Sequence, residues 1–248
     1  MVRGSHTGEV ACGGSRSEQL PSSSAIVSGA GASTPGTPVP PPGDGWTAIW
    51  DGSSTDQLRG YGVAGFPSDR WEIDGGALRA IPGSGVDLVT LDQFGDFELE
   101  FEWRVPAGGN SGVIYRVTET GDPAWTTGPE YQVLDDERHP DGSRPATSAG
   151  ALYDLLEPEG KVLRPVGEYN TGRIVVRDGR VEHWLNGILV VEYGWDDGAM
   201  RERVAASKFA AHDRFMREDR GHIVFQHHGE EAWFRSMRVR ALGGAPTP

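Results

Sequence analysis

The chain has 248 residues, of which 37% are hydrophobic, and its 36 acidic and 23 basic residues give a formal charge of −13. Phosphate backbones and anionic lipids repel so acidic a protein, which argues against nucleic acid and against direct membrane adsorption, whereas neutral sugars remain compatible. The single cysteine, Cys12, excludes an intrachain disulfide and a cysteine zinc site.

Residues 1–43 predict a disordered N-terminal tail or stalk. From Cys12 onward this segment is mainly Ser, Gly, Pro, Thr and Ala, which bury too little apolar area to offset the entropy of ordering. The small residues around Cys12 resemble the end of a bacterial lipoprotein signal, and Arg3 to His6 resembles an expression tag. We therefore expect a periplasmic or cell-surface protein that touches the membrane only through a lipid on Cys12. An unmodified cysteine in a tail is the alternative.

Residues 44–243 predict one all-β domain, a two-sheet antiparallel sandwich, because short β-rich runs alternate with Gly, Pro, Asn and Asp turn signals. Two-residue hairpin turns are expected at Asp74-Gly75, Asp178-Gly179 and Asn186-Gly187. Helical spacing between Asp197 and Phe215 predicts one short helical insertion. Strands are expected at 71–80 (a hairpin), 97–104, 112–117, 130–134, 173–177, 180–185, 188–193, 222–227 and 232–240.

The segment 97–104 alternates apolar residues with glutamates, so that Glu98, Glu100 and Glu102 share one face of a strand. Two such carboxyls could serve a retaining glycosidase, which needs its pair roughly 5 Å apart. A solvated sheet face is the simpler interpretation for Glu98 and Glu100. Glu102 lies nearest the glycine-rich turn that follows, and we keep it as a candidate catalytic residue.

Polar side chains elsewhere predict a site for sugar hydroxyls. Glu130 and Gln132 share one face of the strand 130–134, and Asp135 follows it either as a turn residue or as a metal ligand. His228 ends the strand that starts at His222, and a neutral imidazole is a natural base or metal ligand. Trp125 lies in a polar loop, where its ring could stack on a sugar.

Several motifs occur in an order that resembles the 3-keto-disaccharide hydrolase domain family. They are GWTAIWDG, FELEFEWRV, GNSGVIYR, EYQVLDD, GALYDL, RPVGEYNTGRIVVRDGRVEHWLNG, SKFA and GHIVFQHHGEEAWFRSMRVR, within about residues 44–241. The resemblance implies a concanavalin A-like jelly roll with a concave sugar-binding face, bacterial export, and action on sugars oxidised at carbon three by a partner dehydrogenase. The site residues that it implies are Glu102, Arg116, Glu130, Gln132, Tyr153, Asn170 and His228.

A ketone at carbon three acidifies the hydrogen on carbon two, so a base can start an elimination that expels the group on carbon one, and water then adds to the enone. We expect Glu130 or His228 to be the base, and Arg116 or a divalent metal to stabilise the enolate oxygen. No cofactor is certain; a metal would draw on Glu130, His228 and Asp135. The alternatives are a conventional glycoside hydrolase on unoxidised glycans and a non-catalytic carbohydrate-binding module.

Overall fold

The computed structural model describes residues 45–243. The stalk predicted over residues 1–43 and the lipid expected on Cys12 lie outside this range. Within it, no helix is long and apolar enough to cross a membrane.

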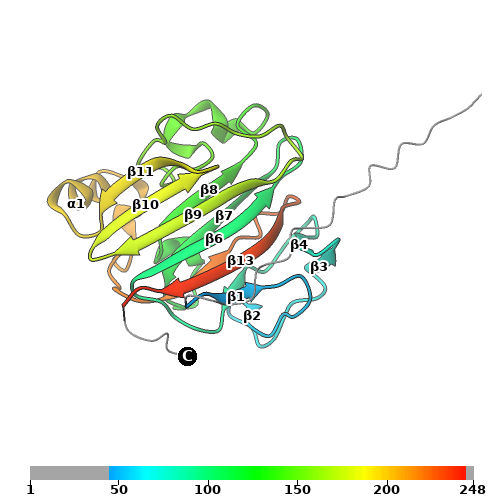
Figure 1. Ribbon diagram of the computed structural model, residues 1–248. Coiled ribbons are helices and arrows are strands. Elements are labelled where there is room, and N and C mark those ends of the chain that lie inside the picture. Colours follow the sequence, from blue (N-terminus) through cyan, green and yellow to red (C-terminus); the bar gives the residue numbers. More distant parts are fainter. Residues whose placement is uncertain (1–44, 244–248) are drawn as a thin grey trace, which may run out of the picture. The chain divides into compact units, whose positions relative to one another are not determined.

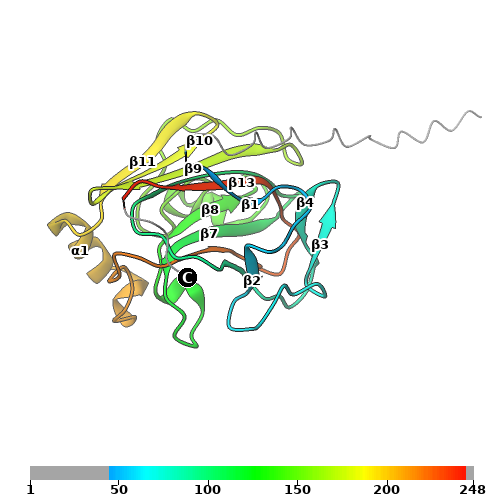
Figure 2. The same cartoon turned by 60° about the horizontal axis from the view of Figure 1, so that its bottom comes forward.

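Two antiparallel sheets stack face to face, as Figures 1 and 2 show, and form the all-β jelly-roll sandwich that the sequence predicts. The larger sheet runs in the order β11 (Ile188–Gly194), β10 (Arg180–Leu185), β9 (Asn170–Arg177), β6 (Phe97–Arg104), β13 (Trp233–Ala241), β4 (Ala77–Ala80) and β3 (Trp71–Asp74), and β1 (Thr47–Trp50) also pairs with β13. The smaller sheet runs in the order β2 (Leu58–Gly60), β5 (Leu88–Thr90), β12 (His222–Phe225), β7 (Asn110–Val117) and β8 (Glu130–Leu134).

Strand β6 shows how alternation in the sequence becomes a core. Its residues Phe97, Leu99 and Phe101 are at most 1% exposed and belong to the main hydrophobic cluster between the sheets. Full burial of such side chains stabilises the fold by roughly 1.5–3 kcal/mol each. The intervening glutamates point away from the core, because successive side chains of a strand leave on opposite faces.

Two of the three predicted hairpin turns are confirmed, and one is displaced by a residue. Asp178 and Asn186 adopt φ values of 49° and 50°, each followed by a glycine at positive φ, as a type I′ turn requires. In the hairpin of β3 and β4, however, Asp74 pairs with Ala77. The turn residues are therefore Gly75 and Gly76 rather than Asp74 and Gly75, since glycine adopts positive φ without strain.

The predicted helical insertion is α1 (Gly198–Ala205) followed by the 3-10 helix η4 (Lys208–Ala211). Asp197 begins α1 as its N-cap, and its carboxylate accepts a hydrogen bond from the Met200 amide at 2.6 Å. The insertion lies at one end of the sandwich, at the left of Figure 1. Three further 3-10 helices lie in connections: η1 (Ala124–Thr126), η2 (Pro140–Ser143) and η3 (Pro145–Thr147).

A buried polar trio joins the two sheets. The hydroxyl of Tyr115, on β7, lies 2.8 Å from His183 Nε2 and 2.7 Å from the Tyr193 hydroxyl, both on the larger sheet. Burial lowers the pKa of His183 to about 4, so this imidazole is neutral in the folded protein at neutral pH. Hydrogen bonding among the three groups offsets the free-energy penalty of burying them.

Candidate active site

The polar site begins on the outer face of β8. Tyr131 and Val133 point into the core, whereas Glu130 and Gln132 point away from it, as the alternation predicts. Glu130 is 8% exposed and Gln132 is 1% exposed, so neither is an ordinary surface residue. Segments outside the smaller sheet therefore cover this part of its face.

A cavity of about 180 Å³ lies over these two side chains. It brings together five residues that the sequence predicts for the site: Trp125, Glu130, Gln132, Tyr153 and His228. Four further residues line it that the sequence analysis did not select: Asn110 from β7, Gln226 directly after β12, and Lys208 and Phe209 from η4.

His228 is held from one side and offers its other ring nitrogen to the cavity. Its Nδ1 lies 2.7 Å from Glu230 Oε2. Because a carboxylate only accepts hydrogen bonds, Nδ1 carries the proton and Nε2 keeps a lone pair when the ring is neutral. Asn110 Nδ2 lies 3.5 Å from His228 Nε2 and 3.5 Å from His139 Nε2. This geometry suits a base that acts on a ligand in the cavity.

Glu130 is the carboxyl that lines the cavity, and its pKa is far above the ordinary value. Burial raises its pKa to about 8; the nearby charge of Lys208 opposes that shift, and Asp87 and Asp141 reinforce it. Glu130 therefore holds its proton at neutral pH and can donate it. A carboxylic acid kept neutral in the same cavity as a histidine is the kind of pair that acid–base catalysis requires.

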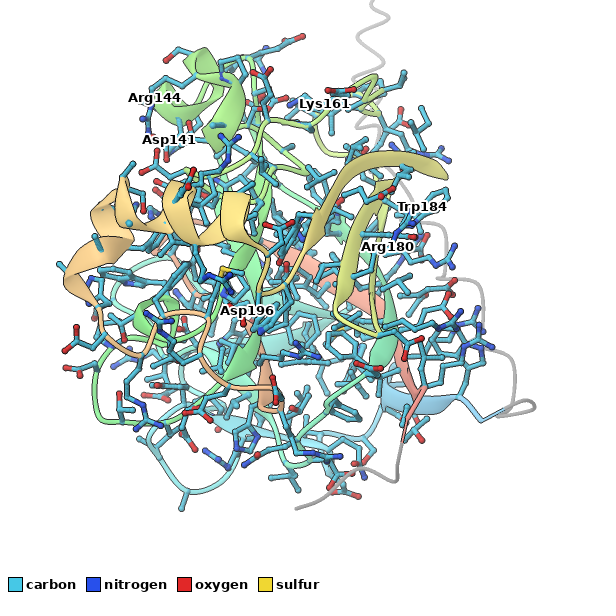
Figure 3. The ribbon with its side chains drawn as sticks, turned by 90° about the vertical axis from the view of Figure 1, so that its left-hand side faces the viewer. Asp141, Arg144, Lys161, Arg180, Trp184 and Asp196 are labelled. Carbon is cyan, nitrogen blue, oxygen red and sulfur yellow. The ribbon has the colours of Figure 1, made fainter. Side chains whose placement is uncertain are left out.

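Tyr153 and Trp125 give the cavity aromatic walls. The Tyr153 hydroxyl donates to Asp141 Oδ2 at 3.3 Å, and burial raises the pKa of this phenol. Figure 3 shows Asp141 and Arg144 at the short helix η2 above the helical insertion. The Trp125 ring packs edge-on against His212, with ring centroids 4.9 Å apart. Aromatic rings in a polar cavity suit the apolar faces of a sugar.

Three buried oxygens of the cavity lack a hydrogen-bond partner among residues 45–243. They are Oδ1 of Asn110, Oε1 of Gln132 and Oε1 of Gln226. Leaving such an acceptor unpaired costs about 1–3 kcal/mol. All three are acceptors, and a ligand with several hydroxyl donors would satisfy them. The cavity is therefore suited to a polyhydroxy compound.

Arg116 does not lie in this cavity, so its predicted role as the oxyanion-stabilising cation is wrong for this structure. Its guanidinium donates to the Gly95 carbonyl at 3.2 and 3.1 Å, pairs with Asp96 at 3.3 Å and stacks 4.3 Å from the Trp195 ring. The reason is local: Arg116 has a φ of 53°, and the pairing of β7 with β12 shifts register beside it. At that shift, the alternation of side chains along β7 no longer predicts the face on which Arg116 lies.

Glu102 is also separated from the cavity. It accepts hydrogen bonds from Arg235 Nε and Ser236 Oγ, both at 2.9 Å, on the outer face of the larger sheet. Glu98 and Glu100 form the same kind of cross-strand pair with Arg240 and Arg238. The glutamates of β6 therefore form an ion-pair ladder, and the predicted catalytic role of Glu102 is corrected.

The side chains of Asn170 and Asp135 make hydrogen bonds within loops. Neither residue lines the cavity that holds Glu130 and His228, which we call the acid–base cavity. Asn170 Oδ1 accepts from the Arg164 amide at 2.9 Å and from Asn186 Nδ2 at 2.8 Å. Asp135 accepts from the amide of Gly108 at 2.7 Å, which is the turn role already considered for it. Both line a separate cavity of about 550 Å³ at the ends of β8 and β9, which shares no lining residue with the smaller one.

The candidate metal ligands do not converge. Within the described part of the chain, no three His, Cys, Asp or Glu side chains are grouped so as to hold a metal ion. Glu130 and His228 share the cavity, but Asp135 does not. These residues do not fit the ligand set of a typical protein metal site.

Comparison with known proteins agrees with the fold and the motifs. A family model described as the 3-keto-alpha-glucoside-1,2-lyase-like domain matches residues 45–240. A 3-keto-disaccharide hydrolase of Bacteroides thetaiotaomicron is 34% identical over 82% of this chain and 81% of that protein.

Solved structures give the same fold. A candidate glycosyl hydrolase of Parabacteroides distasonis superposes with a TM-score of 0.74 at 27% identity, over 80% of this chain and 94% of that chain. A second one from the same organism gives a TM-score of 0.65 at 24% identity, over 79% of this chain and 99% of that chain, which supports the fold alone.

Proposed function

The chain belongs to the 3-keto-α-glucoside-1,2-lyase-like domain family, and from that premise we propose that it cleaves glycosides whose sugar carries a ketone at carbon three. Membership supports a glycoside-hydrolase-like function at the coarse level. The finer proposal concerns the substrate and the order of chemical steps.

The observation that carries the proposal is the pairing of Glu130 with His228 in one small cavity. A raised pKa of about 8 keeps Glu130 protonated at neutral pH. Glu230 orients His228 through Nδ1, and the nearest polar side-chain atom to His228 Nε2 is Asn110 Nδ2 at 3.5 Å. A protonated carboxyl and an imidazole that line one cavity can supply an acid and a base together. An elimination across adjacent carbons needs both.

The steps follow from the acidity that the ketone confers. His228 Nε2 takes the proton from carbon two, and the electron pair of that bond forms an enolate whose charge rests on the oxygen of carbon three. The enolate collapses to restore the ketone, a double bond forms between carbons one and two, and the bond from carbon one to the leaving oxygen breaks. Glu130 protonates that oxygen. Water then adds its hydroxyl to carbon one and a proton to carbon two, so the net reaction is hydrolysis.

The remaining residues of the cavity orient the sugar. The unpaired oxygens of Asn110, Gln132 and Gln226 accept hydrogen bonds from hydroxyls. Trp125 and Tyr153 supply ring faces at the wall. Holding carbon two against His228 in this way converts a bimolecular proton transfer into an intramolecular one.

A conventional glycosidase finds less support in the residues. The glutamates of β6, which could have formed a carboxyl pair, are neutralised by arginines on the outer face of the larger sheet. A non-catalytic binding module has no need for a carboxyl whose pKa is raised to about 8, as that of Glu130 is.

One experiment separates the three functions. The purified protein is incubated with 4-nitrophenyl glucoside and with its 3-keto form, each with and without a chelator, and nitrophenol release and binding are measured. Release from the 3-keto form alone supports the proposal. Release from the unoxidised glucoside supports a conventional glycosidase, and binding without release supports a module. Loss of activity in chelator would add a metal to the scheme.

The proposed substrate also implies partners. A ketone at carbon three must be made by an upstream sugar 3-dehydrogenase, and we infer that such an enzyme supplies this one. The acidic chain favours neutral carbohydrate over nucleic acid as its ligand. We further propose that the natural protein acts in the periplasm or at the cell surface, attached through a lipid on Cys12.

A further inference from the structure

The proposed elimination leaves one role without a residue. Negative charge develops on the oxygen of carbon three, and enzymes stabilise such charge with a cation or with aligned hydrogen-bond donors. Arg116, the cation expected from the sequence, has its guanidinium occupied by Gly95 and Asp96 and does not line the cavity.

Lys208 is the one lysine or arginine among the described residues that line this cavity. We propose that the Lys208 ammonium is the catalytic group that stabilises the enolate oxygen on carbon three of the substrate. The inference rests on the proposed function, because only a 3-keto sugar develops charge at that oxygen.

Aromatic rings hold the ammonium in place. Lys208 Nζ lies 4.3 Å from the ring centroid of Tyr153, 5.1 Å from that of Phe209 and 6.0 Å from that of Trp125. Ring faces attract a charged ammonium. A sugar stacked on the Trp125 or Tyr153 ring would therefore lie within reach of this positive charge.

The donors of Lys208 are available to a ligand. Its nearest carboxylate, Asp154, lies 3.7 Å away, which is an ion pair beyond hydrogen-bonding distance. Among residues 45–243, the Lys208 ammonium makes no side-chain hydrogen bond. Its three N–H groups can therefore turn to a substrate oxygen.

Lys208 and Glu130 line the same cavity. Its charge lowers the pKa of Glu130 against the effect of burial, so the two groups interact electrostatically. On the substrate, carbon two lies between carbon one and carbon three. His228 at carbon two, Glu130 at the oxygen of carbon one and Lys208 at the oxygen of carbon three then give each reacting position one group.

The backbone around Lys208 is fixed by its neighbours. Ser207 caps η4, and its hydroxyl accepts a hydrogen bond from the Phe209 amide at 3.1 Å. The Phe209 ring stacks on Phe215, with centroids 4.1 Å apart and planes 7° from parallel. These contacts hold the backbone from which the Lys208 side chain, itself 45% exposed, reaches the cavity.

An amine can also attack a ketone to form an imine, with loss of water, and an imine would serve as an electron sink. That route needs a neutral amine. The contacts of Lys208 are instead those of a cation, with the Tyr153 ring 4.3 Å from Nζ and the Asp154 carboxylate 3.7 Å from it. The proposal is therefore electrostatic, and covalent attachment is one of the outcomes that the test can detect.

The test compares Lys208→Met and Lys208→Gln with wild type on the 3-keto form of 4-nitrophenyl glucoside. Both neutral variants should lower kcat by about 10²–10³-fold, the usual effect of removing one oxyanion donor, with little change in KM. Lys208→Arg keeps the charge and should give an intermediate kcat. Circular dichroism and thermal unfolding establish that each variant is folded.

The chain has a matched control in Lys161. This lysine pairs with Asp136 at 2.7 Å and lies outside the acid–base cavity. Lys161→Met should keep the wild-type kcat per folded molecule, even if its unfolding temperature falls.

The possible failures are distinguishable. If wild type is active and a folded, neutral Lys208 variant keeps its kcat, the role of Lys208 is overturned while the proposed function stands. If wild type releases nothing from the 3-keto substrate, the proposed function itself is wrong. Borohydride treatment with substrate present should leave the Lys208 peptide unmodified in mass spectrometry; a sugar adduct there would overturn the electrostatic role in favour of an imine.

Discussion

Gly112 and Glu130 lie on neighbouring strands, and the carboxyl of Glu130 occupies the space where a side chain at position 112 would begin. A Cβ built on Gly112 would lie 2.0 Å from Glu130 Oε1, far closer than atoms can approach. Gly112 pairs with Gln132, two residues along β8 from Glu130. The glycine is therefore needed for the position of the acid.

Gly112→Ala should lower activity far more than stability. The added methyl group meets the end of a flexible side chain, which can move aside, but Glu130 then leaves its position in the cavity. A displacement of about 1 Å can lower the rate about 10²-fold. Measured kcat should fall by that order, with a small change in unfolding temperature. Gly198→Ala, where a Cβ meets nothing within 4 Å, is the control and should change neither.

Activity should fall as the pH rises through about 8. Glu130 acts as an acid in the proposed scheme, and its pKa of about 8 means that it loses the required proton above that pH. The profile of kcat against pH tests this. Glu130→Gln should be nearly inactive and should lose that alkaline limb in any residual activity. A wild-type rate that stays constant to pH 10 would contradict the role of Glu130 as the acid.

The raised pKa of Glu130 also predicts that stability decreases as the pH rises. Between its ordinary pKa of 4.5 and about 8, Glu130 is protonated when folded and ionised when unfolded, so the folded state binds more protons. Wild-type stability should therefore decrease as the pH rises through this window. Glu130→Gln should remove that decrease and unfold at a higher temperature than wild type near pH 8. A Gln variant less stable than wild type at that pH would show that Glu130 is ionised in the fold.

His228→Ala should abolish release of the leaving group, because no other base faces carbon two in the proposed scheme. Glu230 is a positioning residue: it holds His228 Nδ1 at 2.7 Å and does not line the cavity. Glu230→Gln keeps a hydrogen-bond acceptor, and it should lower kcat moderately without changing KM. Full activity in His228→Ala would remove His228 as the base.

The buried trio of Tyr115, His183 and Tyr193 predicts sensitivity to acid. The folded pKa of His183 is about 4 against an ordinary value of 6.5, so the unfolded state binds more protons between these values. This contribution to stability is complete above pH 6.5 and is lost as the pH falls toward 4. Urea unfolding at several pH values should show a steeper loss for wild type than for His183→Gln. Equal slopes would mean that His183 does not titrate in this window.

The sequence predicts strands well where one face is buried. The eight residues of β6 and the five of β8 appear at their predicted bounds, because alternation over a whole strand leaves one register for the core. The short strands β1, β2 and β5 were not predicted, since three or four residues carry too little periodicity.

The candidate site was predictable only in part, because alternation along a strand shows which residues share a face but not where that face lies in the fold. Alternation placed Glu130 with Gln132 correctly, but it does not say which face of a sandwich holds the glutamate row of β6. Arg116 lies within a shift in the register of β7 against β12, which no local pattern reveals. Lys208 begins the short 3-10 helix η4, and only the SKFA motif could have indicated it as a site residue. Asn110 and Gln226 likewise lie inside the motifs GNSGVIYR and GHIVFQHHGEEAWFRSMRVR.

The fate of the hydrogen on carbon two tests the proposed chemistry most directly. The 3-keto glucoside is cleaved in D₂O, and the product is examined at early times by NMR against a sample without enzyme. Elimination and hydration remove that hydrogen and return a solvent deuteron, so the product should carry deuterium at carbon two in step with cleavage. A cleaved product that retains its original hydrogen there would mean direct hydrolysis at carbon one, and it would contradict the proton abstraction by His228.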